Sequence, residues 1–456
     1  MASDAGDITG RIAGRRKVTR SGFGWEAMLV TASRFFQRST FFISSLILAR
    51  VLGPDGRGLV SALMVPSQLS VSLSELGIRQ STAYHIGKDV FPLERVLPTL
   101  LMMIPLASTL AIALSLGYFR YAGIAQNDWL LQGIAVATIP LSLAVSYASG
   151  VFLGRQRMAA FRSTSWRPAS FRLFLIVILC WLMPFGVYGA LIATLAGAML
   201  GAAYAFYLLG KEGRLRLGFD REVATAIQRR GVTYAASMIV LMLNYKIMTL
   251  LLTKFSTLAA VGLYTQATVV AELIWEIPMA MSSLVLSRGV NAKREDEFSR
   301  KVIVLARISF LAAVIVSTGL SLVAPFAFRI LFGHEFAKSA DLCVILLPGV
   351  VAFIVFKILN TDLAGRGKPW AAMMVMAPVL ISNIVLGWWM IVHYGVTGAA
   401  AASSISYVVA AIGYVLLYSY ITHVPLRDIL IYRRSDLTLL LDKLPGARGG
   451  KKTAKA

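Results

Sequence analysis

Long apolar stretches separated by short polar segments dominate the pattern of this 456-residue chain. Runs without a charged residue cover 96–119, 129–154, 173–210, 308–328, 371–392 and 394–426. About 20 apolar residues are needed to cross about 30 Å of membrane hydrocarbon. The 173–210 run is long enough for two crossings, and Pro184-Phe185-Gly186 marks a turn between them. The pattern therefore predicts an all-α integral membrane protein that crosses the bilayer many times.

We expect about twelve transmembrane helices. They are predicted at residues 23–52, 57–87, 96–118, 129–154, 171–185, 187–210, 230–253, 258–287, 302–328, 340–365, 370–393 and 396–422. The first, second and eighth are less apolar than the others because they carry polar residues. No cleavable signal is expected in the first 22 residues, which are polar and basic.

The formal net charge of +23 is explained by where the basic residues lie. If the N-terminal tail is cytoplasmic, the segments on its side of the membrane hold 33 Lys and Arg, and the opposite side holds 6. This bias is the positive-inside signal, and it places both termini in the cytoplasm. The basic tails are suited to anionic membrane lipids, and nucleic-acid binding is not expected.

Parts of the two halves of the chain resemble each other. LGRQRMAAF (153–161) corresponds to AGRGKPWAA (364–372), and GVYGA (186–190) to GVTGA (395–399). Gly58-Leu59-Val60 likewise corresponds to Gly262-Leu263-Tyr264. An even number of helices in each half predicts a parallel repeat, a known transporter design with its site between the halves.

The repeat divides the chain into five segments. We expect a basic cytoplasmic tail (1–22), an N-terminal six-helix lobe (23–210), a cytoplasmic linker (211–229), a C-terminal six-helix lobe (230–422) and a second basic tail (423–456). A cavity between the lobes is then the natural place for a transport site.

Several stretches resemble one membrane family. They are LARVLGPDGRGLVSAL (48–63), AVGLYTQATVVAELIWEIPMAM (260–281), LLPGVVAFIVFKILNTDLAGRGKPWAA (346–372) and HYGVTGAAAASSISY (393–407). The chain resembles the Wzx-type oligosaccharide and polysaccharide flippases of the multidrug/oligosaccharidyl-lipid/polysaccharide (MOP) superfamily over most of residues 25–422. The resemblance implies a MATE-like transporter with two six-helix lobes in a V. In relatives, an acid often follows two positions after the basic residue of the seventh helix; here Met248 stands two positions after Lys246.

The resemblance implies a flippase that moves undecaprenyl-pyrophosphate-linked repeat units across the bacterial inner membrane for polysaccharide synthesis. It leaves open a polysaccharide polymerase and glycosyltransferases as partners. A drug/cation antiporter of the same superfamily is the first alternative, and a membrane enzyme of polysaccharide assembly is the second. No cofactor is expected, since no Gly-rich phosphate loop followed by Lys-Ser/Thr is present. The four histidines are far apart, and we expect neither a metal site nor a catalytic residue.

Four cations predicted inside helices are the candidates for holding the pyrophosphate: Arg34, Arg38, Lys246 and Lys357. A charge at the centre of a membrane helix costs about 2.5–3.5 kcal/mol on insertion scales, so such residues should face protein or a wet cavity. Counted from the outer helix ends at about 1.5 Å per residue, Arg34 and Glu75 are level, which favours an ion pair. Arg38 and Lys246 have no acid at their level and are the stronger candidates for binding the anion.

The remaining polar residues of the helices allow two interpretations each. Glu272 and Glu276, one helical turn apart, are candidates for ion coupling or for structural contacts. Lys357, Asn360 and Asp362 lie on one predicted helix, where we expect them to satisfy one another rather than bind a ligand.

Overall fold

The computed structural model describes residues 20–276, 295–368 and 370–431. Most of both predicted basic tails, and the end of the predicted helix 258–287, lie outside the described residues. The described part of the chain is almost entirely helical and contains no β-strand. The all-α prediction is confirmed.

The first half of the chain forms six labelled helices and a π-helical segment. These are α1 (Arg20–Glu75), α2 (Ile78–Gly87), α3 (Leu93–Ala122), α4 (Trp129–Gly154), α5 (Met158–Ile176) with the π-helical η1 (Val177–Leu182), and α6 (Gly186–Glu212). The second half comprises α7 (Arg221–Phe255), α8 (Leu258–Ala271) with the 3₁₀ turn η2 (Glu272–Trp275), α10 (Glu295–Phe332), the 3₁₀ turn η3 (His334–Phe336), α11 (Ala337–Gly365), α12 (Trp370–Thr422) and α13 (Leu426–Leu430).

The two longest helices, α1 and α12, each contain a sharp kink. Gly53 (φ 63°, ψ −177°) interrupts α1, and Gly395 (φ 58°, ψ −138°) interrupts α12. Glycine adopts such positive φ values readily because it has no Cβ. Ten helices of the described residues are long and apolar enough to span a membrane. Because α1 and α12 each fold back at their kink, they provide two crossings apiece, and the expected number of about twelve is confirmed.

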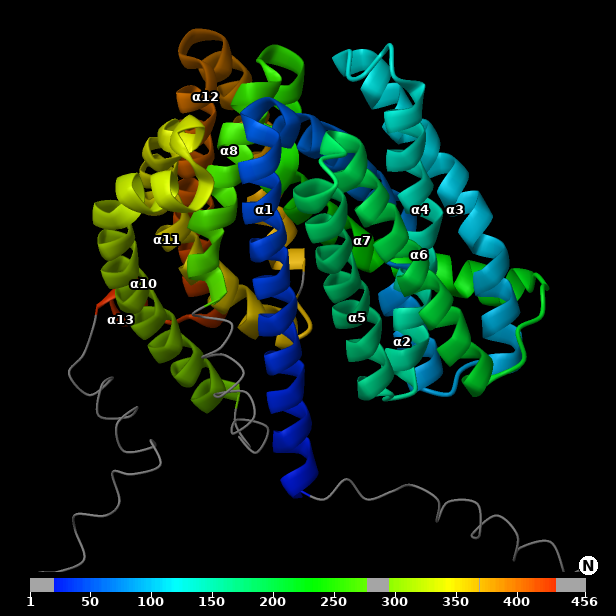
Figure 1. The fold of residues 1–456 in the computed structure, drawn as a ribbon. Helices are drawn as coiled ribbons and strands as arrows, with labels where there is room; N and C mark the ends of the chain where they lie inside the picture. Colours follow the sequence, from blue (N-terminus) through cyan, green and yellow to red (C-terminus); the bar gives the residue numbers. More distant parts are fainter. Residues whose placement is uncertain (1–19, 277–294, 369, 432–456) are drawn as a thin grey trace, which may run out of the picture.

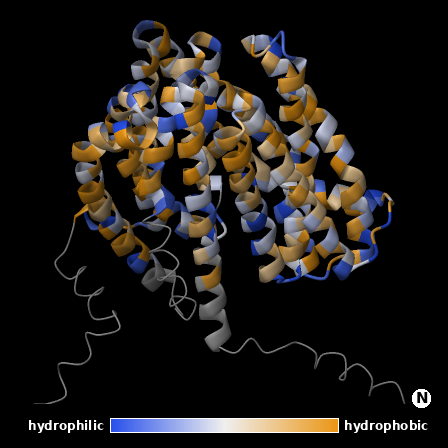
Figure 2. Ribbon diagram, viewed as in Figure 1, coloured by the Kyte–Doolittle hydropathy of each residue, from blue (hydrophilic) through white to orange (hydrophobic). Residues whose placement is uncertain are grey.

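The helices form two lobes with separate apolar cores (Figure 1, Figure 2). The C-terminal core joins α7, α8, α10, α11 and α12, whereas two smaller clusters fill the lobe built from α1 to α6, and one of these also includes Val223, Ala224 and Ile227 at the start of α7. In Figure 1 the start of α1 lies at the lower end of the molecule, here called the basal end. The bend of α1 lies towards the upper end, called the apical end.

Several helix boundaries differ from the sequence predictions. The predicted helix 57–87 is broken after Glu75, and Gly77 there meets Gly231 so closely that an added Cβ would lie 2.3 Å from the Gly231 carbonyl oxygen. The helix predicted from residue 171 begins at Met158, and α7 begins at Arg221, inside the predicted linker. Basic residues had suggested loops there, but the helices accommodate them: the Arg167 guanidinium, for example, lies 4.7 Å from the centroid of the Tyr204 ring.

Candidate functional site

A cavity of about 150 Å³ lies where the two lobes meet. From the first half of the chain it is lined by both segments of α1, by α5 and by α6, and from the second half by α7, α8 and η2. Much of its wall carries hydroxyl or amide groups, from Ser44, Ser45, Ser61, Gln68, Thr194, Thr249, Thr265 and Thr268. The cavity is therefore polar, although apolar helices surround it.

The charges of the cavity wall are mostly positive. Four cations line it, Arg38, Arg57, Arg172 and Lys246, and Glu272 is the one acid among its lining residues in the described chain. A low-dielectric surrounding strengthens the field of such a cluster. An excess of fixed cations in a polar cavity is suited to an anionic ligand.

Arg57 is the most deeply buried of these cations, with 7% of its surface exposed. It lies one turn after the kink at Gly53, where Nη1 donates to Ser61 Oγ at 3.0 Å and Nη2 to Ser45 Oγ at 3.2 Å. Its Nε has no hydrogen-bond partner, and no ion pair joins it to an acid of the described chain. Arg57 is the first residue of the predicted helix 57–87 and was counted with the basic residues outside the membrane; the structure instead buries it in the cavity wall, because the helix resumes directly after Gly53.

Arg172 lies on α5 and lines the same cavity. Its Nε is also buried without a hydrogen-bond partner. The ring of Phe41 is flanked by two guanidinium groups, since the Cζ atoms of Arg172 and Arg38 each lie 5.8 Å from its centroid. Arg172 lies at the start of the predicted helix 171–185 and was counted with the basic residues outside the membrane; because α5 already begins at Met158, Arg172 lies well inside a membrane helix.

Arg38 connects the two lobes through ion pairs. Its Nη2 lies 3.8 Å from Glu272 Oε2, and its Nε lies 3.3 Å from Glu276 Oε1. The prediction compared Arg38 only with acids of the second predicted helix; the partners of Arg38 come instead from the C-terminal lobe. Lys246 lines the cavity from α7, and no ion pair joins it to another described residue.

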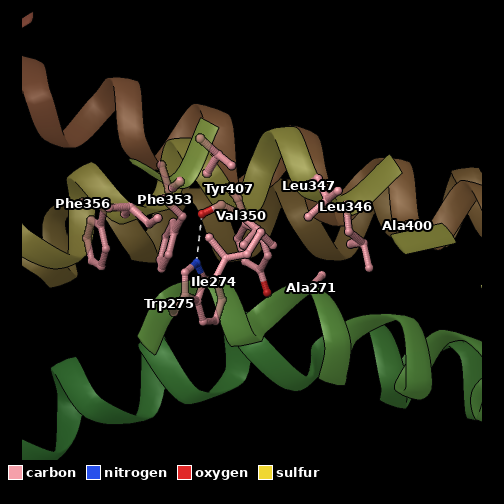
Figure 3. Close-up of a cluster of buried hydrophobic side chains, with 14 of the residues drawn as sticks. Ala271, Ile274, Trp275, Leu346, Leu347, Val350, Phe353, Phe356, Ala400 and Tyr407 are labelled. Atoms are coloured by element: carbon pink, nitrogen blue, oxygen red, sulfur yellow. Dashed lines mark hydrogen bonds between the residues drawn. The ribbon is translucent and has the colours of Figure 1, made fainter. Parts of the chain in front are cut away.

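Lys357 lies beside the cavity, behind an aromatic cluster. Its Nζ lies 4.0 Å from the centroid of the Trp275 ring and 3.3 Å from the hydroxyl oxygen of Tyr245, which itself lines the cavity. Figure 3 shows this cluster, in which Trp275 Nε1 donates to the carbonyl oxygen of Val350 at 2.9 Å and packs near Phe353. The aromatic faces stabilise the ammonium group without an acid in contact.

Arg34 and Glu75, predicted to form an ion pair, do not meet. Arg34 is exposed, and Glu75 Oε1 lies 3.6 Å from Nε of Arg79, one turn further along the chain. The prediction matched the two residues by depth alone, and depth does not define the direction in which a helix presents a side chain. Neither residue lines the cavity.

Asp362 is fully buried inside the C-terminal lobe, away from the cavity. It accepts hydrogen bonds from Tyr418 at 2.6 Å and Ser299 at 2.5 Å, and Arg366 lies 3.3 Å away. Asn360 instead accepts a hydrogen bond from Tyr414. The expected mutual contacts with Lys357 are therefore replaced by contacts to other helices, which points to a structural role for Asp362.

The apical side of the cavity is closed by contacts between the lobes. A Cβ added to Gly58 would lie 1.8 Å from the Leu258 carbonyl oxygen, so α1 and α8 touch backbone to backbone. The Tyr118 hydroxyl donates to the Leu250 carbonyl oxygen at 2.7 Å, and Arg50 Nε donates to that of Leu331 at 2.7 Å. On the basal side, the Arg38 ion pairs and the close backbone contact of Gly77 with Gly231 connect the lobes.

Solved structures with the same fold are transporters and flippases. An inward-facing multidrug resistance MATE family transporter of the MOP superfamily matches with a TM-score of 0.71 at 15% identity, covering 85% of this chain and 95% of that one. The lipid II flippase MurJ in its inward closed conformation matches with a TM-score of 0.72 at 15% identity, covering 88% and 89%. The Vibrio cholerae MATE transporter VcmN in its bent form matches with a TM-score of 0.57 at 16% identity, covering 91% and 100%. No curated protein sequence matches this chain.

The chain thus has the fold of these MATE and MurJ structures, and its long apolar helices make it a multi-pass membrane protein. The family model described as polysaccharide biosynthesis protein matches residues 25–286, more than half of the chain. The chain belongs to this family, and the predicted family relationship is confirmed.

Proposed function

We propose that this protein flips undecaprenyl-pyrophosphate-linked oligosaccharide repeat units across the bacterial inner membrane, for O-antigen, capsule or exopolysaccharide synthesis. The observation that carries the proposal is the charge of the inter-lobe cavity, lined by four cations and one acid among its described residues. Two of the cations, Arg57 and Arg172, have buried Nε donors without partners. Guanidinium groups bind two phosphate oxygens at once, which suits a pyrophosphate.

The cavity wall fits the other demands of such a cargo. The lipid tail remains in the bilayer, so the protein has to shelter only the pyrophosphate and the sugars. Hydroxyl-bearing side chains such as Ser44, Thr249 and Thr268 line the cavity beside the cations, and they can exchange hydrogen bonds with sugar hydroxyls. Because α1 and α7 belong to different halves, Arg38 and Lys246 can contact one head group from both lobes.

Arg38 gives a physical route to alternating access. In this conformation it is held by Glu272 and Glu276 of the opposite lobe. An incoming phosphate competes with these carboxylates for the guanidinium, so binding of the cargo loosens the basal contact between the lobes. With both termini in the cytoplasm, two phosphate charges leaving a negative interior would gain about 2.3 kcal/mol each per 100 mV if they crossed unpaired.

The cation antiporter alternative would need a cavity dominated by acids. Glu272 is the one acid among the described lining residues, and it faces Arg38. A membrane enzyme is less supported, because the matching solved structures are transporters and flippases. The anionic cargo is therefore the better fit to this wall.

The test is flipping of a fluorescent undecaprenyl-pyrophosphate sugar in proteoliposomes, with and without an imposed potential. We expect Arg57→Ala and Arg172→Ala to reduce the rate at least tenfold, since a hydrogen bond to a charged group contributes about 1.5–3 kcal/mol. Arg34→Ala is the matched control, because Arg34 is exposed and does not line the cavity. Wild-type rates for both cavity variants, or transport of a cationic dye that depends on Glu272, would overturn the proposal.

A further inference from the structure

The segment between α6 and α7, residues 213–220, is held in a fixed, extended course. Before it, Glu212 lies 2.7 Å from Arg157 and 3.5 Å from Arg155. At its end, Asp220 lies 2.6 Å from Arg95 and accepts hydrogen bonds from the first backbone N–H groups of α7. Figure 1 shows the segment at the lower outer edge of the N-terminal lobe, near the basal ends of the membrane helices.

The sequence of this segment alternates basic and apolar side chains. It reads Arg214-Leu215-Arg216-Leu217-Gly218-Phe219, and successive side chains of an extended chain point to opposite sides. Leu217 and Phe219 are 79% and 63% exposed. Two large apolar side chains held outward by a fixed segment are unfavourable in water and favourable against the hydrocarbon boundary of a membrane.

The basic side chains face a hollow with an apolar wall. Arg214 and Arg216 line a cavity of about 430 Å³ together with Leu93, Leu97 and Pro98 at the start of α3. Glu94 is the one acid among its lining residues in the described chain, so cations outnumber acids. A pair of guanidinium groups over an aliphatic wall matches the phosphate of a phospholipid and the first part of its acyl chains.

We propose that this segment is a binding site for an anionic phospholipid of the surrounding membrane, and that it anchors the junction between the lobes at the bilayer surface. Arg214 and Arg216 hold the head-group phosphate, the α3 residues contact the glycerol and upper acyl region, and Leu217 and Phe219 enter the boundary of the hydrocarbon. The site is separate from the inter-lobe cavity and does not depend on the cargo.

The experiment is native mass spectrometry of the full-length protein released from micelles that contain both phosphatidylglycerol and phosphatidylcholine, in equal amounts. We expect wild-type protein to retain phosphatidylglycerol preferentially. Each basic residue near an anionic lipid surface contributes roughly fivefold in binding, so Arg214→Gln with Arg216→Gln should reduce retention roughly 25-fold. Retention of phosphatidylcholine should change little.

Two further variants keep the result interpretable. Lys88→Gln with Arg427→Gln removes the same charge from exposed positions outside the hollow and should leave retention unchanged. Arg214→Lys with Arg216→Lys keeps the charge and should retain most of the lipid, which separates loss of binding from misfolding. Equal phosphatidylglycerol retention by wild type and the double Gln variant would overturn the proposal, as would an equal loss in the Lys88 and Arg427 control.

Discussion

Gly58 and Gly262, which occupy corresponding positions in the two halves of the chain, lie against each other at the apical end of the inter-lobe boundary. The position where a Cβ of Gly58 would lie is 3.1 Å from the Gly262 nitrogen, and that of Gly262 is 3.1 Å from the Gly58 nitrogen. The repeat thus brings two equivalent turns together across the boundary between the lobes. Only glycine permits such an approach, because any Cβ would overlap the opposing backbone.

The first prediction follows from this contact. Gly58→Ala would place a Cβ 1.8 Å from the Leu258 carbonyl oxygen, so the apical ends should separate and the open form should become more populated. Spin labels at the exposed positions Arg120→Cys and His393→Cys, one on each lobe, should report a longer distance. Gly117→Ala is the control, since nothing lies within 4 Å of its added Cβ. An unchanged distance in the Gly58 variant would refute the assignment.

The sequence predicted the crossings well because burial in lipid imposes long apolar runs. It also paired Gly58 with Gly262 as equivalent positions, although only the structure shows that they touch. It missed Arg57 and Arg172 as cavity residues because each lies at the end of a predicted helix, where basic residues were counted with the segments outside the membrane. The signal that identifies Arg57 is the Ser61 hydroxyl four residues later, on the same helix face. The Arg34–Glu75 pair failed because depth along a helix does not give the rotation of the helix about its axis.

The second prediction concerns Arg57, which is buried without an acid partner in the described chain. Arg57→Met should leave the free energy of unfolding unchanged or raise it, by about 1–4 kcal/mol, as when other buried ionic groups are replaced by apolar residues of similar size. The same change should reduce flipping at least tenfold. Thermal unfolding in detergent and the proteoliposome assay measure the two quantities. If stability and flipping fall together, Arg57 is structural rather than part of the site.

The third prediction concerns Glu75. Its ion pair with Arg79 spans one helical turn and is partly exposed, so a double-mutant cycle with Glu75→Ala and Arg79→Ala should give a coupling energy of about 0.3–0.5 kcal/mol. A cycle of Glu75→Ala with Arg34→Ala should give none, because Arg34 is exposed and does not contact Glu75. Thermal unfolding of the full-length protein measures both cycles. Coupling to Arg34 in place of Arg79 would contradict the observed pairing.

The fourth prediction concerns Asp362, whose carboxylate is enclosed by Tyr418, Ser299 and Arg366. Asp362→Ala should destabilise the protein by about 3–5 kcal/mol, because it removes one partner of a buried ion pair and the acceptor of the Tyr418 and Ser299 hydroxyls. Thr361→Ala, at the exposed neighbouring position, is the control and should have little effect. Protein level and unfolding temperature are the measurements. A loss of flipping at normal stability would instead assign Asp362 to transport.

The fifth prediction separates an anionic cargo from a cationic one. Glu272 and Glu276 share Arg38, so Glu272→Gln should free part of the guanidinium and remove negative charge from the cavity wall. Binding of undecaprenyl pyrophosphate should then tighten about two- to fivefold, since an ion pair of this partly exposed kind contributes up to about 1 kcal/mol.

Equilibrium binding of undecaprenyl pyrophosphate to the purified protein measures the change. Glu335→Gln, at an exposed apical position, is the control and should leave the affinity unaltered. If Glu272 bound a cationic drug instead, the result would differ. Glu272→Gln would no longer bind a cationic dye, and its affinity for undecaprenyl pyrophosphate would stay the same. A carboxylate that competes with a phosphate weakens binding of the phosphate, whereas a carboxylate that holds a cation is needed to bind the cation. The effect of Glu272→Gln on ligand affinity therefore distinguishes the flippase from the antiporter.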